Sequence, residues 1–129
     1  MEIKYIENQS FGIWFIITCA YLLLILLSYL VIKKKWAEKQ SSLIGFRTIM
    51  SFRSDITWHF ANTHFFNVFS KISIISLLIH VVYFSVTKNP EQAFVYSRNF
   101  YGISFILLVV LLEVILIYKF NWKGEFRKK

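Results

Sequence analysis

The sequence predicts an all-α integral membrane protein, a single domain over residues 1–129 built as a bundle of three transmembrane helices. Three observations predict it. Of the 129 residues, 57% are hydrophobic and only four are Gly and one Pro, which excludes disordered and collagen-like chains. Three apolar runs are each close to the length that crosses a bilayer, and the basic residues collect beside them. A water-soluble domain does not expose so much apolar surface.

The first predicted span covers residues 11–32. This run of 22 residues carries no formal charge and is followed at once by Lys33, Lys34 and Lys35. At ~1.5 Å per residue the helix reaches about 33 Å, enough for a hydrocarbon core of ~30 Å. A cleaved signal peptide has its basic residues before a shorter apolar core, so the run is interpreted as a retained transmembrane helix.

The second and third spans contain charged residues. Residues 72–87 are an uncharged run of only 16, so the second span is expected at about 66–87, with Lys71 reaching toward the interface through its long side chain. The third span, about 100–119, contains one acid, Glu113, and ends at Lys119.

The distribution of Lys and Arg predicts the orientation. Three of them, Lys4, Lys88 and Arg98, fall on one side of the three spans, and twelve fall on the other. The twelve are Lys33, Lys34, Lys35, Lys39, Arg47, Arg53, Lys71, Lys119, Lys123, Arg127, Lys128 and Lys129. The positive-inside rule then places the amino terminus outside and the carboxyl terminus inside. The net charge of +8 is thus explained by topology and by contact with anionic membrane lipid, and no nucleic-acid partner is expected.

The segment between the first two spans, residues 33–65, is predicted to be a cytoplasmic loop with an amphipathic or helical part. Ser54, Asp55 and Thr57 form a helix-start signal. After it, apolar residues recur at steps of three and four, which predicts one buried face. That face consists of Trp58, Ala61, Phe65, Val68, Phe69 and Ile72. Such a helix would lie along the membrane surface or extend the second span inward.

The same loop carries a set of residues at ordered spacing. They are Gly45, Phe46, Arg47, Thr48, Ser51, Thr57, Trp58, Ala61 and Asn62. This set resembles the signature of the small bacterial membrane proteins similar to the sporulation-delaying-protein immunity protein, the SdpI-like family. The position in a loop between two apolar spans is similar to the family's as well. Where family members commonly have a Gly-Lys pair after the Asn, this sequence has Phe65, Phe66 and Asn67.

The resemblance implies an immunity protein of the bacterial cytoplasmic membrane, which protects its own cell against a secreted membrane-active peptide toxin. In some members it also implies a signal to a cytoplasmic regulator. The motif residues would then form or support a functional site at the inner face. The residues by themselves also permit a structural interpretation, in which Arg47 and Arg53 contact lipid phosphates, Trp58 lies at the interface and Asn62 hydrogen-bonds the loop backbone.

Two ionisable residues lie inside the predicted spans. Glu113 and His80 are expected at similar depths, about 9 Å and 12 Å from the inner ends of their spans. An ionised acid in hydrocarbon is costly and faces protein or water, so His80 is a candidate partner for Glu113. The alternative is a protonated Glu113 that hydrogen-bonds a hydroxyl such as Ser28, Ser73 or Ser76.

Signatures of catalysis and of metal binding are missing from the sequence. His59 and His64 are five residues apart, a poor spacing for one helical face, and the single cysteine, Cys19, is distant from them. Phosphate-binding loops and nucleophile elbows are absent as well. We therefore expect no enzyme, no metal and no cofactor.

Two other functions fit the general features of the chain. A phage-like holin is also small, has spans of this kind and carries a basic tail. An accessory subunit of a larger membrane complex would share these features, and a homo-oligomer is a further expected assembly. Only the loop motif favours immunity over these alternatives.

Overall fold

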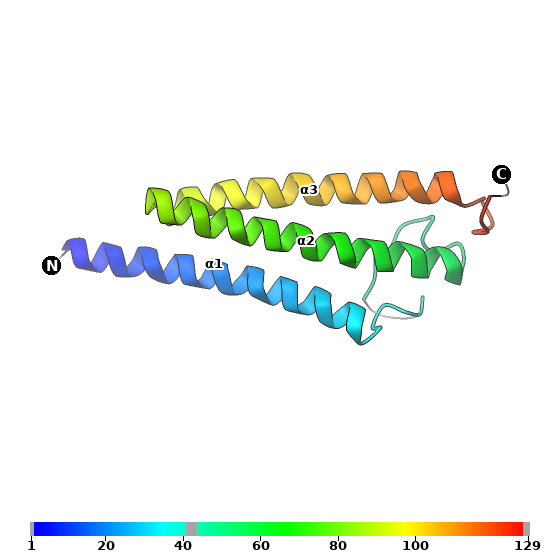
Figure 1. Cartoon of the computed structure of the whole chain (residues 1–129), viewed down its shortest axis with the longest axis horizontal. Coiled ribbons are helices and arrows are strands. Elements are labelled where there is room, and N and C mark those ends of the chain that lie inside the picture. The colour runs from blue at the N-terminus through cyan, green and yellow to red at the C-terminus, as the bar shows by residue number, and fades with distance from the viewer. Residues whose placement is uncertain (1, 41–43, 128–129) are drawn as a thin grey trace.

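The computed structural model describes residues 2–40 and 44–127, and over that range it consists of three long helices (Figure 1). They are α1 (Glu2–Lys33), α2 (Asp55–Thr87) and α3 (Pro90–Lys119). The described residues add one isolated antiparallel bridge, Phe120 to Phe126. The predicted all-α class with three helices is confirmed. All three are long and apolar enough to cross a membrane, as a multi-pass membrane protein requires.

The helices are longer than the predicted spans. The second helix begins at Asp55, eleven residues before the start expected near 66, and the third begins at Pro90, ten residues before 100. The amphipathic segment is therefore a direct extension of the second span at its amino-terminal end, and it does not form a separate helix. The helices continue through charged and polar residues that flank the apolar runs, so the runs underestimate the lengths of the helices.

Local signals explain where α2 starts. Ser54 is its N-cap, with an extended backbone, and its hydroxyl accepts a hydrogen bond from the Thr57 amide at 3.1 Å. The Thr57 hydroxyl in turn accepts from the Ser54 amide at 3.0 Å, which completes a capping box. The helix start predicted from Ser54, Asp55 and Thr57 is confirmed.

A two-residue turn joins α2 to α3. Lys88 takes a left-handed conformation with φ of 56°, and the side chain of Asn89 accepts hydrogen bonds from the Glu91 and Gln92 amides, both at 3.1 Å. Pro90 occupies the first turn of α3, where a missing amide hydrogen costs nothing. We call this end of the bundle the turn end. The opposite end, which carries residues 34–40, residues 44–54 and the tail after α3 up to residue 127, is the loop end (Figure 1).

The three helices lie side by side, with α2 between α1 and α3 (Figure 1). At the loop end a small core forms where the loop packs between the helices. It consists of Phe46, Met50, Ala61, Leu112, Leu116 and Phe120. The outward faces are exposed and mainly apolar, as expected for a surface in contact with lipid. The orientation across the membrane stays a prediction, and Lys128 and Lys129, two of the charges behind it, lie outside the described residues.

Candidate functional site

Trp58 connects the loop to the first helix. Its indole is fully buried, and the indole N–H donates to the backbone carbonyl of Ala37 at 2.7 Å. Ala37 lies just beyond the end of α1, so this bond spans 21 residues of sequence. Trp58 therefore fixes the exit of α1 against the first turn of α2, and its indole is covered by protein, while its depth relative to the membrane surface stays a prediction.

Asn62, one turn further along α2, holds the loop backbone. Its side-chain oxygen accepts from the amide of Phe46, and its side-chain nitrogen donates to the carbonyl of Trp58 at 2.9 Å. The buried amide group thus has partners on both of its atoms. The structure therefore contains the hydrogen bond between Asn62 and the loop backbone that the structural interpretation of the sequence expected.

Gly45 is required by space. A Cβ atom there would lie 2.6 Å from two ring carbons of Trp58 and 2.9 Å from the side-chain oxygen of Asn62. No larger residue fits without moving the indole or breaking the bond to Phe46. Gly45, Trp58 and Asn62, which are separate positions of the motif, therefore meet in one three-way contact.

Ser51 and Thr48 close the turn that follows. The hydroxyl of Ser51 is buried, accepts from the Thr48 amide at 2.8 Å and lies 3.0 Å from the Phe46 carbonyl, to which it can donate. The amide of Ser51 donates back to the Thr48 hydroxyl at 3.3 Å. We call the set Gly45, Phe46, Thr48, Ser51, Thr57, Trp58, Ala61 and Asn62 the loop lock, because each of them is packed or hydrogen-bonded within this contact.

The carboxyl-terminal tail touches the same region. The hydroxyl of Ser54 donates to the carbonyl of Gly124 at 2.7 Å, and the guanidinium of Arg53 lies 3.7 Å from the ring centroid of Trp122. Gly124 has φ of +79°, and a Cβ there would lie 2.8 Å from the Cβ of Ser54. Neither contact was predicted, because both join segments about 70 residues apart; the Gly in the tail was the one available turn signal.

The loop lock leaves a distinct set of side chains exposed, which we call the loop face. Ile49 is 71% exposed, Ile56 51% and Phe52 42%, and the Arg47 guanidinium lies 5.7 Å from the centroid of the Phe52 ring. The motif thus divides into residues that build the loop and one exposed residue, Arg47, that the loop presents. A guanidinium among apolar side chains can bind carboxylate, phosphate or a peptide carbonyl.

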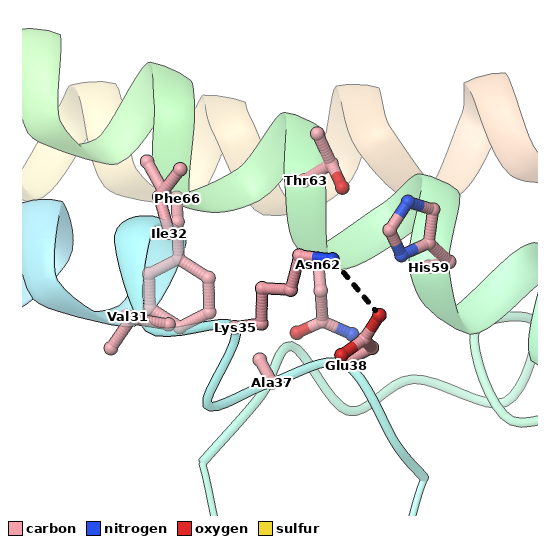
Figure 2. A pocket seen from close by; sticks show the side chains of 9 residues that line it. All are labelled: Val31, Ile32, Lys35, Ala37, Glu38, His59, Asn62, Thr63 and Phe66. Atoms are coloured by element: carbon pink, nitrogen blue, oxygen red, sulfur yellow. Dashed lines mark ion pairs between the residues drawn. The ribbon is translucent and has the colours of Figure 1, made fainter.

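A shallow pocket lies beside the loop lock, between the end of α1 and the first turns of α2 (Figure 2). It is lined by Val31, Ile32, Lys35, Ala37, Glu38, His59, Asn62, Thr63 and Phe66. Lys35 and Glu38 form an ion pair of 3.6 Å at its opening (Figure 2). The volume is about 70 Å³, far below the ~300 Å³ at which small-molecule sites begin, so the pocket is a packing feature of the loop lock.

Glu113 belongs to the loop end. One carboxylate oxygen accepts from the Met50 amide at 3.4 Å, and the other is buried without a hydrogen-bond partner among the described residues. Its partner is therefore the loop backbone. Neither His80 nor the hydroxyls of Ser28, Ser73 and Ser76 takes that role.

His80 lies in the other half of the bundle. It is fully buried against Trp14 and Tyr21 of α1, with ring centroids 6.3 Å and 6.0 Å away. His80 lies seven residues before the end of α2, which is at the turn end of the bundle. Glu113 lies six residues before the end of α3, which is at the loop end. His80 and Glu113, a candidate pair from the sequence, are therefore not partners in the structure, because α2 continues much further toward the loop end than its uncharged run, and that run alone placed His80 too close to the loop end.

Within the described residues, no group of three His, Cys, Asp or Glu side chains is placed to hold a metal ion. His59 and His64 both lie exposed near the start of α2, and His64 contacts the Phe60 carbonyl of its own helix at 2.8 Å. Cys19 is a free, exposed thiol on α1.

Comparison with known proteins identifies a family. No match was found among curated proteins or among solved structures. A family model described as the SdpI/YfhL protein family matches residues 38–119, which covers the loop lock, α2 and α3. This family is not a known enzyme family. With a match over more than half of its length, the chain belongs to the SdpI/YfhL protein family, a family of membrane immunity-type proteins.

Proposed function

We propose that this chain protects the cell that makes it against a secreted, membrane-active peptide toxin. Family membership supports an immunity-type role, and one structural observation carries the finer proposal. Eight motif residues pack or hydrogen-bond within the loop lock, and the ninth, Arg47, is exposed beside Ile49 and Phe52. A sequence signature that builds a rigid support for one exposed cation and its apolar neighbours is typical of a recognition surface.

The loop face is the proposed contact surface. Membrane-active peptides are amphipathic, so apolar side chains next to a guanidinium offer both kinds of contact that such a peptide needs. The hydrogen bonds of Ser51 and Asn62 keep the loop backbone ordered, which lowers the entropic cost of binding. The same surface is available to a cytoplasmic regulator, and relay of a toxin signal through it is part of the proposal.

The test is expression of the full chain in a toxin-sensitive bacterium, followed by challenge with a panel of purified membrane-active bacterial peptides. We expect survival and membrane potential to be maintained against at least one peptide. Arg47→Glu should abolish this protection while the amount of protein in the membrane is unchanged. Ile49→Ser should weaken it.

A matched control is Ile103→Ser, which changes a similarly exposed isoleucine on α3, far from the loop face. It should protect like the original chain. Protection that survives Arg47→Glu would remove the loop face from the mechanism. Killing and loss of membrane potential on expression without toxin would instead identify a holin and overturn the immunity proposal.

A further inference from the structure

A groove runs along the outside of the bundle between α2 and α3, in the half nearer the loop end. Its floor consists of three buried side chains, Ile72, Leu108 and Leu112. Ser104 and His64 are the polar residues of its lining. Its volume of about 350 Å³ falls in the ~300–1,000 Å³ range of ligand sites. The rims are exposed and consist of Val68, Leu107, Leu111 and Ile115.

The groove begins level with the basic end of α1. Thr63 and Phe66, which flank His64 in the sequence, line the small pocket beside the loop lock together with Ile32 and Lys35 of the first helix and its exit. Lysines that follow an uncharged span mark a membrane interface. His64 therefore lies at the level of that interface, and the groove leads from it along α2 toward the turn end.

The groove is about as long as one leaflet of a bilayer is thick. From Ser104 to Ile115 it follows about 16 Å of helix rise. The hydrocarbon core is ~30 Å thick, so one leaflet contributes about 15 Å. An acyl chain that lies along the helices has this length, whereas an α-helix about 10 Å across is too wide to enter the groove.

A histidine and a lysine converge at the mouth of the groove. The rings of His64 and Phe60 stack with their centroids 4.1 Å apart, and Nζ of Lys119 lies 4.9 Å from the centroid of the same Phe60 ring. Lys119 follows Ile115 by four residues and so shares its side of α3. Across the described ranges, no carboxylate lies within ion-pair distance of Lys119. Its ammonium group can therefore bind an anion that enters from the membrane.

His64 is oriented by its own helix. Its Nδ1 lies 2.8 Å from the carbonyl oxygen of Phe60, which can only accept, so Nδ1 carries a hydrogen. Nε2 is then the ring atom that faces a ligand. It accepts from a hydroxyl group when the ring is neutral and donates to a phosphate when the ring is protonated. Both groups occur in the headgroup of an anionic phospholipid.

We propose that this groove holds one acyl chain of an anionic phospholipid from the leaflet nearer the loop end. The phosphate binds Lys119, and the remainder of the headgroup meets His64. This is a defined site for one lipid molecule, and it goes beyond the general attraction of basic residues to a charged membrane. The apolar floor and rims bind the chain, and the cation at the mouth selects the headgroup.

The headgroup is tested by native mass spectrometry of the detergent-purified full chain. The protein is titrated with phosphatidylglycerol or with phosphatidylcholine that carries the same acyl chains. We expect one molecule of phosphatidylglycerol to bind more tightly than phosphatidylcholine. Lys119→Gln should weaken phosphatidylglycerol binding about tenfold and leave phosphatidylcholine binding unchanged. Lys34→Gln, which removes an exposed lysine at the end of α1, is the matched control and should bind like the original chain.

Variants that fill the groove test the acyl chain. Val68→Phe and Leu111→Phe, on opposite rims, should weaken the binding of both lipids, because the larger ring occupies the groove. Val82→Phe, at an exposed position of α2 outside the groove, should leave binding unchanged. Thermal unfolding midpoints establish that each variant is folded.

Three results would overturn the proposal. The first is equal binding of the two lipids by the original chain. The second is unchanged binding in folded Val68→Phe and Leu111→Phe. The third is binding of glycerol phosphate as tight as that of the lipid, which would show a phosphate site without an acyl chain. Because these readouts need no toxin, they are independent of the proposed function.

Discussion

The bundle contains two clusters of buried polar side chains, and the two are satisfied very differently. At the loop end, the side chains of Ser51 and Asn62 bond backbone groups of the loop. Toward the turn end, both ring nitrogens of His80, the Ser76 hydroxyl and the Trp14 indole N–H are buried without a hydrogen-bond partner among the described residues. Ser51 and Asn62 are therefore fully bonded, whereas the second Glu113 oxygen and the Arg53 Nε at the same end lack a partner among the described residues, as do the polar atoms of His80, Ser76 and Trp14.

The difference follows from what each cluster faces. The loop is irregular, so its amides and carbonyls need partners, and side chains of α2 supply them. The second cluster lies among three helices whose backbone groups already bond within each helix. Loss of a member should therefore be expensive at the loop end and cheap near His80.

The largest effect is expected from Trp58→Ala. The change removes a fully buried indole and its bond to the Ala37 carbonyl, and should lower the free energy of unfolding by about 3–5 kcal/mol. Thermal unfolding in detergent micelles measures it. Trp36→Ala, which truncates an exposed indole at the same end, is the control and should change stability little.

Gly45→Ala should cost about 1–3 kcal/mol, because the new methyl group would overlap the ring of Trp58. Gly102→Ala is the matched control, since nothing lies within 4 Å of a Cβ at that helical position. The control should be neutral or slightly stabilising. Equal thermal midpoints for both variants would contradict the three-way contact of Gly45, Trp58 and Asn62.

Asn62→Leu should destabilise by about 1–3 kcal/mol, since it leaves the buried Phe46 amide without its acceptor. Hydrogen exchange provides the sharper measurement, with faster exchange expected at the Phe46 amide and in the following turn. Asn99→Leu, an exposed substitution on α3, should leave those amides unchanged.

The smallest effect is expected in the second cluster. His80→Leu and Ser76→Ala each remove polar atoms that have no partner, so stability should stay within about 1 kcal/mol or rise. Ser51→Ala, which removes a bonded hydroxyl, is the comparison and should be worse than Ser76→Ala. A strong loss of stability in His80→Leu would show that this cluster is a bonded network after all.

Local signals in the sequence predicted the parts of the fold that depend on neighbouring residues. The start of α2 after Ser54 follows from capping chemistry, and the end of α1 at Lys33 follows from the lysines that close its apolar run. Contacts between distant segments were beyond such signals. The motif named Trp58, but nothing in the sequence identified the Ala37 carbonyl as its acceptor.

The candidate pairing of His80 with Glu113 is not found in the structure for a related reason. The depth of His80 was predicted from the uncharged run 72–87. The helix, however, continues through polar residues back to Asp55, because Trp58, Ala61 and Phe65 pack against the rest of the bundle. Phe65 also shows what replaces the Gly-Lys pair of the resembled signature. It stacks on Phe46 at 4.9 Å and so adds an apolar contact to the loop.

Two carbonyls that accept hydrogen bonds from Trp58 and Ser54 lie outside the stretch that the family model matches. The Ala37 carbonyl precedes residues 38–119 by one position, and the Gly124 carbonyl follows them by five. The stretch that the family model matches is thus smaller than the portion of this chain that folds together. A peptide excised at those limits, or a fusion that displaces the tail turn, would keep every signature residue and still lose the bonds that orient Trp58 and Ser54.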